Sequence, residues 1–288
     1  MRKIHKFLSV VLAIMMVWSI VPVTAFAANA GSCGDNLTWV YNSSTYTLTI
    51  SGTGNMHDFS YTNRPWEAQE DKIKTVVIND GVTSIGAYAF YSFGKVTSIT
   101  IPDSVTKIGI TAFNACKLLT SIELPEGITS IPNRAFTNCT SLTSITIPAN
   151  VKIIGSSAFE GCSGLTTVVI PEGVTTINDK AFASCKGLTS IVIPASVTSI
   201  DITAFENCTN LASLTVDSNN PNYSIDEFGV LFNKEKTTLI MYSKGSTATS
   251  YTIPDSVTTI GASAFEGCSS LASISIPEGV NTLLLLQG

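Results

Sequence analysis

Residues 165–184 read LTTVVIPEGVTTINDKAFAS, and the same pattern begins again at Cys185-Lys186-Gly187-Leu188. Its Ala-Phe pair recurs with a 23-residue period, and the last copy follows after 60. The phenylalanines of this series are Phe90, Phe113, Phe136, Phe159, Phe182, Phe205 and Phe265. Prolines and cysteines keep the same period, at Pro102, Pro125, Pro148, Pro171 and Pro194 and at Cys116, Cys139, Cys162, Cys185 and Cys208. The fixed period indicates a repeat protein, because one such unit cannot bury its own core.

Each unit predicts one coil of a solenoid. Residues 142–147 alternate apolar and polar side chains and are rich in β-branched residues, which is typical of a half-buried strand. Pro148 ends that strand, and Pro-Glu-Gly at 171–173 is typical of a tight turn. A second apolar pair, such as Val174 and Ile177, follows the turn, and Ala-Phe-x-x-Cys then has the spacing of one inward-pointing helical turn.

One slot of the unit predicts a left-handed backbone, because it holds residue types that accept a positive φ. Its occupants are Gly86, Gly109, Gly155, Asn178, Asp201 and Gly261. Pro132 stands in the same slot and does not fit, since proline fixes φ at about −65°. Either that repeat turns differently or the left-handed assignment is wrong.

The motif L-x-x-I-x-I-P-x-x-V-x-x-I-G-x-x-A-F-x-x-C resembles the BspA-type leucine-rich repeat of bacterial surface and secreted proteins. The resemblance covers residues 73–283, with seven Ala-Phe slots in register. It implies a leucine-rich-repeat solenoid with a parallel main sheet on the concave face. It also implies a role in adhesion or protein binding, and it supplies no catalytic residues.

Residues 1–27 predict a secretory signal. Residues 1–6 are basic, 7–21 are an uncharged apolar run, and Ala25-Phe26-Ala27 is a small-x-small cleavage pattern. The apolar run is shorter than the ~20 residues of a bilayer-spanning helix. We therefore expect an exported bacterial protein, secreted or at the cell surface, with no membrane span after signal cleavage.

Two further segments break the repeat. Residues 28–72 contain the alternating stretches 37–41 and 46–50, which predict a small β-hairpin cap that covers the first coil together with Trp66. Residues 217–250 predict a turn and two strands, a hairpin island that projects from the stack as a tolerated loop or as a binding element. Residues 284–288 form an irregular C-terminus without an Ala-Phe turn, so we expect a fragment or a truncated gene product.

The sequence offers little for catalysis. The periodic cysteines predict buried, unpaired thiols, because stacked residues have parallel Cβ vectors and Phe93 occupies the same slot in the first repeat. Cys33, outside the series, is the candidate reactive or intermolecular thiol. His57 lacks a nucleophile motif beside it, and the turn acids (Asp80, Asp103, Glu126, Glu172, Asp255 and Glu278) lack a calcium-binding repeat. We expect no enzyme activity, no cofactor and no metal site.

The charge balance bears on the partner. The chain has 16 Lys and Arg residues against 21 Asp and Glu residues. Signal cleavage removes Arg2, Lys3 and Lys6, which leaves 13 basic residues and a net charge of −8. We therefore do not expect a nucleic-acid partner held by a basic face. We expect the partner to be an extracellular protein or glycan.

The solvent side of the main sheet is the candidate partner-binding face. Strand alternation exposes two rows of small, mostly uncharged side chains, which are Ser98, Thr100, Ser121, Glu123, Ser144, Thr146, Thr167, Val169, Ser190, Val192, Ser213 and Thr215. We expect a macromolecular partner to bind this face or the island. The alternative is a rigid spacer of a larger surface protein, with no ligand of its own.

Overall fold

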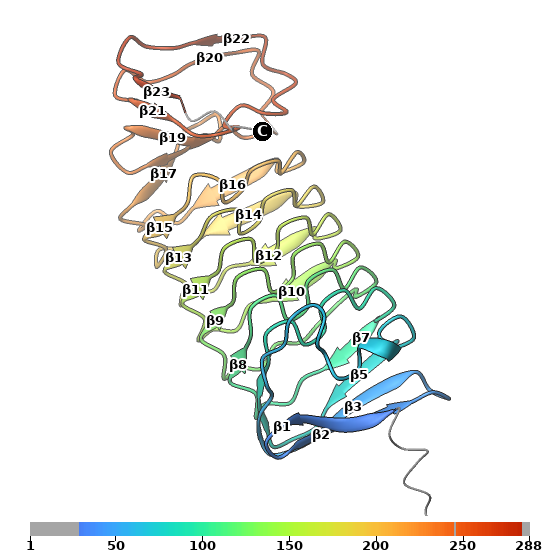
Figure 1. Cartoon of the computed structure of the whole chain (residues 1–288). Coiled ribbons are helices and arrows are strands. Elements are labelled where there is room, and N and C mark those ends of the chain that lie inside the picture. Colours follow the sequence, from blue (N-terminus) through green and yellow to red (C-terminus); the bar gives the residue numbers. More distant parts are fainter. Residues whose placement is uncertain (1–28, 245, 284–288) are drawn as a thin grey trace, which may run out of the picture.

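The computed structural model describes residues 29–244 and 246–283. The predicted signal segment 1–27 and the irregular end at 284–288 lie outside the described residues. The repeats stack into a solenoid with strands along two sides, here called the main sheet and the second sheet, each interrupted at some coils (Figure 1). The main-sheet strands of the repeats are β5 (Thr75–Ile78), β7 (Ser98–Thr100), β10 (Ser144–Thr146), β12 (Thr167–Val169), β14 (Ser190–Ile193), β16 (Ser213–Val216), β20 (Ser250–Thr252) and β22 (Ser273–Ser275).

The second sheet runs down another side of the stack. Its strands in the repeats are β6 (Val82–Ile85), β8 (Lys107–Ile108), β9 (Ser130–Ile131), β11 (Ile153–Ile154), β13 (Thr176–Ile177), β15 (Ser199–Ile200), β21 (Thr259–Ile260) and β23 (Thr282–Leu283). Strands of successive repeats pair in parallel in both sheets, and the repeat period sets the register. Ser144 pairs with Thr167 in the main sheet, and Ile154 pairs with Ile177 in the second. The parallel repeat solenoid predicted from the sequence is confirmed.

The periodic phenylalanines form a column of stacked rings inside the solenoid. Successive rings from Phe90 to Phe205 have centroids 5.2–5.7 Å apart and lie within 4–15° of parallel. The backbone runs beside them in a second ladder, in which the Phe113 amide donates to the Ala135 carbonyl at 2.9 Å. Each phenylalanine from Phe90 to Phe182 therefore contacts the next coil through both its ring and its backbone amide, and none of them can shift without disturbing that coil.

The helical turn expected at Ala-Phe-x-x-Cys is wrong. This segment makes consecutive β-turns, in which the Cys162 amide donates to the Phe159 carbonyl and the Leu165 amide to the Cys162 carbonyl. The 3-10 turn η3 (Glu67–Gln69) is the one helical element among the residues described. Every second backbone donor of this segment, such as the amides of Phe159 and Gly161, bonds to a carbonyl of the next coil, so a continuous helix cannot form there.

The left-handed slot is also misplaced. Gly86, Gly109, Gly155 and Gly261 have no positive φ, and left-handed residues follow two and six positions later, as at Arg134 (φ 57°) and Asn138 (φ 60°). Glycine is favoured here because a larger residue would clash with the adjacent coil. A Cβ at Gly86 would lie 1.8 Å from the His57 carbonyl oxygen of that coil. Pro132 fits the slot because φ there is negative.

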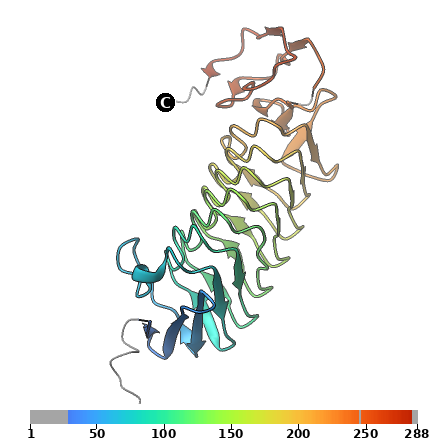
Figure 2. The same ribbon diagram turned by 90° about the vertical axis from the view of Figure 1, so that its right-hand side faces the viewer.

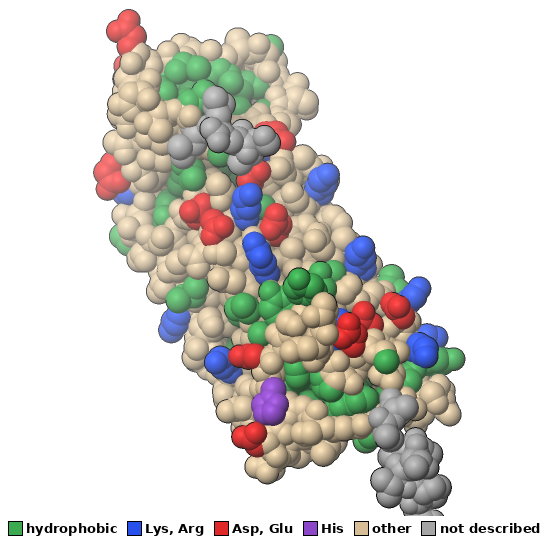
Figure 3. All heavy atoms as spheres, in the orientation of Figure 1, with side chains coloured by type: hydrophobic (Ala, Val, Ile, Leu, Met, Phe, Trp, Pro, Cys, Tyr) green, Lys and Arg blue, Asp and Glu red, His purple; other side chains and the backbone are tan. Residues whose placement is uncertain are grey.

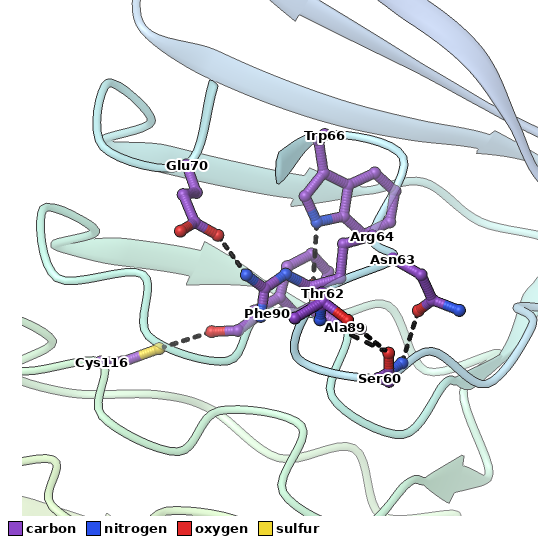
Figure 4. A network of polar contacts seen from close by, with 9 residues as sticks. All are labelled: Ser60, Thr62, Asn63, Arg64, Trp66, Glu70, Ala89, Phe90 and Cys116. Carbon is purple, nitrogen blue, oxygen red and sulfur yellow. Dashed lines mark hydrogen bonds and ion pairs between the residues drawn. The ribbon is translucent and has the colours of Figure 1, made fainter. Parts of the chain in front are cut away.

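The N-terminal segment extends the main sheet and covers the first coil. Strands β1 (Ala30–Gly34), β2 (Leu37–Asn42) and β3 (Thr47–Gly52) are antiparallel, and β3 pairs in parallel with β5. Strand β4 (Gly54–Asn55) starts the second sheet against β6. Trp66 is fully buried, stacks on Phe90 at 5.7 Å and donates its indole N–H to the Ala89 carbonyl (Figure 4). Trp66 thus continues the aromatic column to its first ring.

The island does not project from the stack. It forms three strands, β17 (Tyr223–Ile225), β18 (Leu231–Asn233) and β19 (Thr238–Met241), which lie within the second sheet (Figure 1), and β19 pairs with β21. Met241-Tyr242 occupies the Ala-Phe slot, because the Tyr242 amide donates to the Ala264 carbonyl as each phenylalanine does to its neighbour. Most of the island's apolar side chains are buried in the core, although Phe228 is exposed, and this burial explains the island's place in the stack.

Replacing Phe159 with Ala tests the aromatic column. Phe159 is fully buried between two stacked rings, so we expect Phe159→Ala to lower the free energy of unfolding by ~3–5 kcal/mol in urea denaturation. Val169→Ala, at a position that is 72% exposed, serves as the control and should change stability by less than about 0.5 kcal/mol. Equal effects of the two changes would contradict this account.

Candidate partner-binding face

The main strands lie on one side of the stack, on the right in Figure 2. Alternate residues of each strand, such as Ile145, Val168 and Ile191, point into the core and are at most 6% exposed. All side chains predicted for the partner-binding face are exposed, namely Ser98, Thr100, Ser121, Glu123, Ser144, Thr146, Thr167, Val169, Ser190, Val192, Ser213 and Thr215. The structure thus brings them to solvent as expected, and their role in binding stays a prediction.

The centre of this face is apolar. Val169 on β12 is 72% exposed and Val192 on β14 is 58% exposed, while their neighbours Thr146 and Thr215 are polar. Strands of a sheet lie about 4.8 Å apart, so the two valines form one small apolar spot. An apolar centre within a polar rim is the usual anatomy of a protein interface.

The main sheet is interrupted where residues 121–123 pass between β7 and β10. Ser121 and Glu123 are exposed and Ile122 is buried, but this coil has no strand in the main sheet. A hollow of about 240 Å³ lies beside it, lined by residues 97–101 and 121–123. Glu123, the one charged residue predicted for the face, lines this hollow.

A larger cavity lies where the island interrupts the sheet a second time. The main sheet ends at β16 and resumes at β20, and between them is a cavity of about 450 Å³. Ser213 and Leu214 line it from β16, and Phe228 lines it from the island. The sequence did not predict this cavity, which joins the two candidate binding elements, the main-sheet face and the island, into one surface.

Asp226 holds the loop that carries Phe228. Its carboxylate accepts hydrogen bonds from the amides of Phe228 and Val230, at 3.0 and 2.8 Å, and from the Tyr251 hydroxyl, at 2.7 Å. Burial, followed by the nearby Asp226 carboxylate, raises the pKa of Tyr251, so this phenol stays protonated and keeps donating. The cavity wall is therefore fixed in the absence of a partner.

The cysteine series is a core element and offers no nucleophile. Each of Cys116, Cys139, Cys162, Cys185 and Cys208 is free and buried, as predicted. The Cys162 thiol donates to the Phe136 carbonyl at 3.0 Å, and the equivalent bond recurs along the series. Burial raises the pKa of Cys139 and of Cys208 to about 12, so neither forms a thiolate at neutral pH.

The assignment of Cys33 as the reactive thiol is wrong. Its side chain is 1% exposed, between the N-terminal strands and the first coil, and burial raises its pKa to about 12. The sequence placed it outside the periodic series but could not show that β1 packs against the core. Cys268, in the last described Ala-Phe turn, is the least buried of the cysteines.

Other candidates for chemistry are spread over the surface. His57 is exposed and its Nε2 lies 3.2 Å from the Asp35 carboxylate, also exposed. No cluster of three or more His, Cys, Asp or Glu side chains that could hold a metal occurs within residues 29–244 and 246–283. Over the same part of the chain, no helix has the length and apolar character needed to cross a bilayer.

Comparison with known proteins identifies the repeat. Residues 68–189, 129–243 and 240–284 match the model of the BspA type leucine rich repeat region, in six copies. No curated protein matches the chain.

Several solved structures are similar. A leucine-rich repeat protein from Eubacterium ventriosum is 32% identical with a TM-score of 0.57, and the match covers 88% of this chain but only 61% of that protein. A leucine rich cell surface protein from Faecalibacterium prausnitzii is 27% identical with a TM-score of 0.66, over 88% of this chain and 76% of the other. The pneumococcal vaccine antigen PcpA, 24% identical with a TM-score of 0.65 over 88% and 67%, supports the fold alone.

Thiol labelling tests the burial of the cysteines. In the native protein we expect Ellman's reagent to react slowly with Cys268 alone, because the other thiols are buried. In guanidinium chloride all 7 cysteines should react. A Cys268→Ser variant is the control and should show no reaction in the native state. Rapid labelling of native Cys33 would contradict its burial.

The raised pKa values of the buried thiols predict how the free energy of unfolding depends on pH. An unfolded cysteine has a pKa of about 8.5, whereas burial raises the pKa of Cys139 to about 12. Between these values the unfolded chain loses a proton that the folded chain keeps, so the free energy of unfolding should fall as pH rises above ~9. Urea denaturation of Cys139→Ala should show a slope shallower by ~1.4 kcal/mol per pH unit. An unchanged slope would show that Cys139 ionises in the folded state.

Proposed function

The chain belongs to the BspA-type leucine-rich repeat family, and we propose from this that it is exported to the bacterial surface, where it binds an extracellular protein or glycan through the main-sheet face. Export is supported by the signal pattern at residues 1–27. The similar Faecalibacterium prausnitzii protein is described as a cell surface protein, which agrees with this location.

The observation that carries the proposal is the apolar centre of the main-sheet face. Val169 is the most exposed large hydrophobic residue among those described, and Val192 lies beside it on the next strand. A rigid spacer without a ligand needs only a polar surface here. Polar side chains already occupy the surrounding rows, so the two valines supply the apolar area that a partner can bury.

The island cavity extends the same surface. Phe228 is 37% exposed at the rim of this cavity, and the loop that holds it is fixed by Asp226. A partner lying along the main strands can therefore insert a side chain into the cavity without first ordering a loop. Such preorganisation reduces the entropy cost of binding.

The proposed partner contacts are nearly uncharged. Glu123 is the one ionisable residue in the predicted rows. Binding through this face should therefore depend weakly on ionic strength, because screening acts mainly on exposed charges. Catalysis is not proposed, since the residues that could act as nucleophile or base are buried or isolated.

Paired arginine substitutions test the face. The purified protein is screened against an array of extracellular-matrix proteins and glycans, and the bound probe is then tested with Thr146→Arg plus Val169→Arg. These residues are direct partners on β10 and β12, so two arginines there should weaken binding at least ~10-fold. The matched control, Ser130→Arg plus Ile153→Arg, places the same charges on exposed partners in the second sheet and should bind normally.

The outcomes of this experiment distinguish a partner-binding protein from a rigid spacer without a ligand. Equal binding by both folded double variants would rule out the main-sheet face as the site. No binding to any probe at about micromolar concentration would favour the rigid spacer.

A further inference from the structure

A second hollow lies away from the main sheet, at the Ala-Phe turns of the first coils. It has a volume of about 480 Å³, within the usual range for small-ligand sites. We define the tyrosine groove by six of its lining residues, Tyr61, Tyr88, Tyr91, Arg134, Asn138 and Glu160. Figure 3 views this side of the molecule and shows hydrophobic side chains, tyrosine included, gathered over the lower coils.

Three tyrosines form one wall of the groove. Their ring centroids are 6.0–6.4 Å apart and the rings are tilted by 54–58°. Tyr61 is 62% exposed, although a large aromatic side chain gains free energy by burial. Tyr88 and Tyr91 are half-buried beside it, so Tyr61 is the ring most open to solvent at this hollow.

The loop that carries Tyr61 is held in place. The Ser60 amide donates to the Asn63 Oδ1 at 2.6 Å, and Arg64, buried behind the loop, pairs with Glu70 (Figure 4). The Arg64 guanidinium also lies 5.6 Å from the centre of the Tyr91 ring. Trp66, two residues on, anchors the loop in the core. The aromatic wall is thus preorganised.

The rest of the lining includes polar side chains that are free to bind a ligand. Arg134 and Asn138 come from one Ala-Phe turn and Glu160 from the turn of the next coil. Within the described part of the chain, none of the three uses its side chain in a hydrogen bond or ion pair. Together they offer donors and acceptors, and the charges of Arg134 and Glu160 cancel.

The backbone of the groove floor is already used. The amides of Tyr88, Thr111 and Arg134 donate to carbonyls of the next coil at 2.9–3.0 Å. A peptide ligand would find no free backbone donors there to pair with its own main chain. Recognition must come from side chains.

A sugar ring matches this combination of groups. Its C–H face packs against the face of an aromatic ring. The hydroxyls around its rim both donate and accept, and so match the Asn138 amide, the Arg134 donors and the Glu160 acceptors. A second hollow of about 220 Å³ shares Tyr88 and Arg134 with the groove and continues across further coils. We propose that the tyrosine groove binds a neutral oligosaccharide of more than one residue.

Saturation-transfer NMR with defined oligosaccharides tests the proposal. The probes are maltohexaose, cellohexaose, xylohexaose, mannohexaose, chitohexaose and lacto-N-tetraose, each added to the purified protein. We expect transfer to at least one probe and a loss of affinity of at least ~10-fold in Tyr61→Ala and in Arg134→Ala. Tyr61→Phe, which keeps the ring, should retain most of the affinity. Tyr46→Ala, at an exposed tyrosine of the β2–β3 turn, should bind as the unaltered protein does.

Two further arms make the result decisive. The Thr146→Arg plus Val169→Arg protein should keep its oligosaccharide binding, so that this site and the proposed function fail independently. A proline-rich peptide is the competing ligand, since aromatic grooves also bind polyproline helices. The proposal is overturned if no oligosaccharide binds, if binding persists in the folded Tyr61→Ala and Arg134→Ala proteins, or if only the peptide binds.

Discussion

The stacking of one aromatic ring per coil is the constraint on which the rest of the structure depends. Rings 5.2–5.7 Å apart fix the rise of the solenoid, and this rise is close to the strand spacing of a sheet. Both sheets can therefore pair in register over many coils. The close approach of the coils in turn requires glycine at Gly86 and Gly109, where a Cβ would meet backbone of the neighbouring coil.

Two of the surfaces that can bind a partner, the island cavity and the tyrosine groove, arise where this regularity breaks. The island separates β16 from β20 and opens the larger cavity on the main-sheet side. The N-terminal loop adds Tyr61 beside the first two tyrosines of the repeats and creates the groove on the other side. A perfectly regular solenoid would present a uniform surface, so the departures from the repeat supply the chemical detail that selective binding needs.

The repeat architecture could be predicted because its signals are periodic. Strand, turn and core positions recur with one fixed period, and the exposed rows of the main sheet follow from alternation alone. The backbone conformation at Gly86 could not be predicted in the same way, because glycine is favoured both by a positive φ and by close packing of two backbones. Pro132 was the one residue in this slot whose presence argued against a positive φ.

Other features needed tertiary information. Tyr242 lies one repeat period before Phe265, and this spacing indicates that the island contains a coil of the solenoid. The coil is hard to recognise in the sequence because Met241-Tyr242 replaces its Ala-Phe pair. Tyr88 and Tyr91 occupy slots that hold smaller or charged residues in later repeats, and that departure was a usable signal for the groove. The burial of Cys33 left no signal in the sequence, because it depends on how β1 packs against the core.

The break in the aromatic column has a mechanical consequence. The core divides into two clusters, and among the described residues Phe205 makes no backbone bond to Met241 like those between other coils. Side chains tie the island to the preceding coil instead, as when Asn220 donates to the carbonyls of Pro194 and Val197. Under tension along the stack, these few bonds and the apolar contacts of the island side chains in the first cluster carry the load that a full backbone ladder shares elsewhere. The solenoid should part first at the island, and its two halves should yield in separate steps.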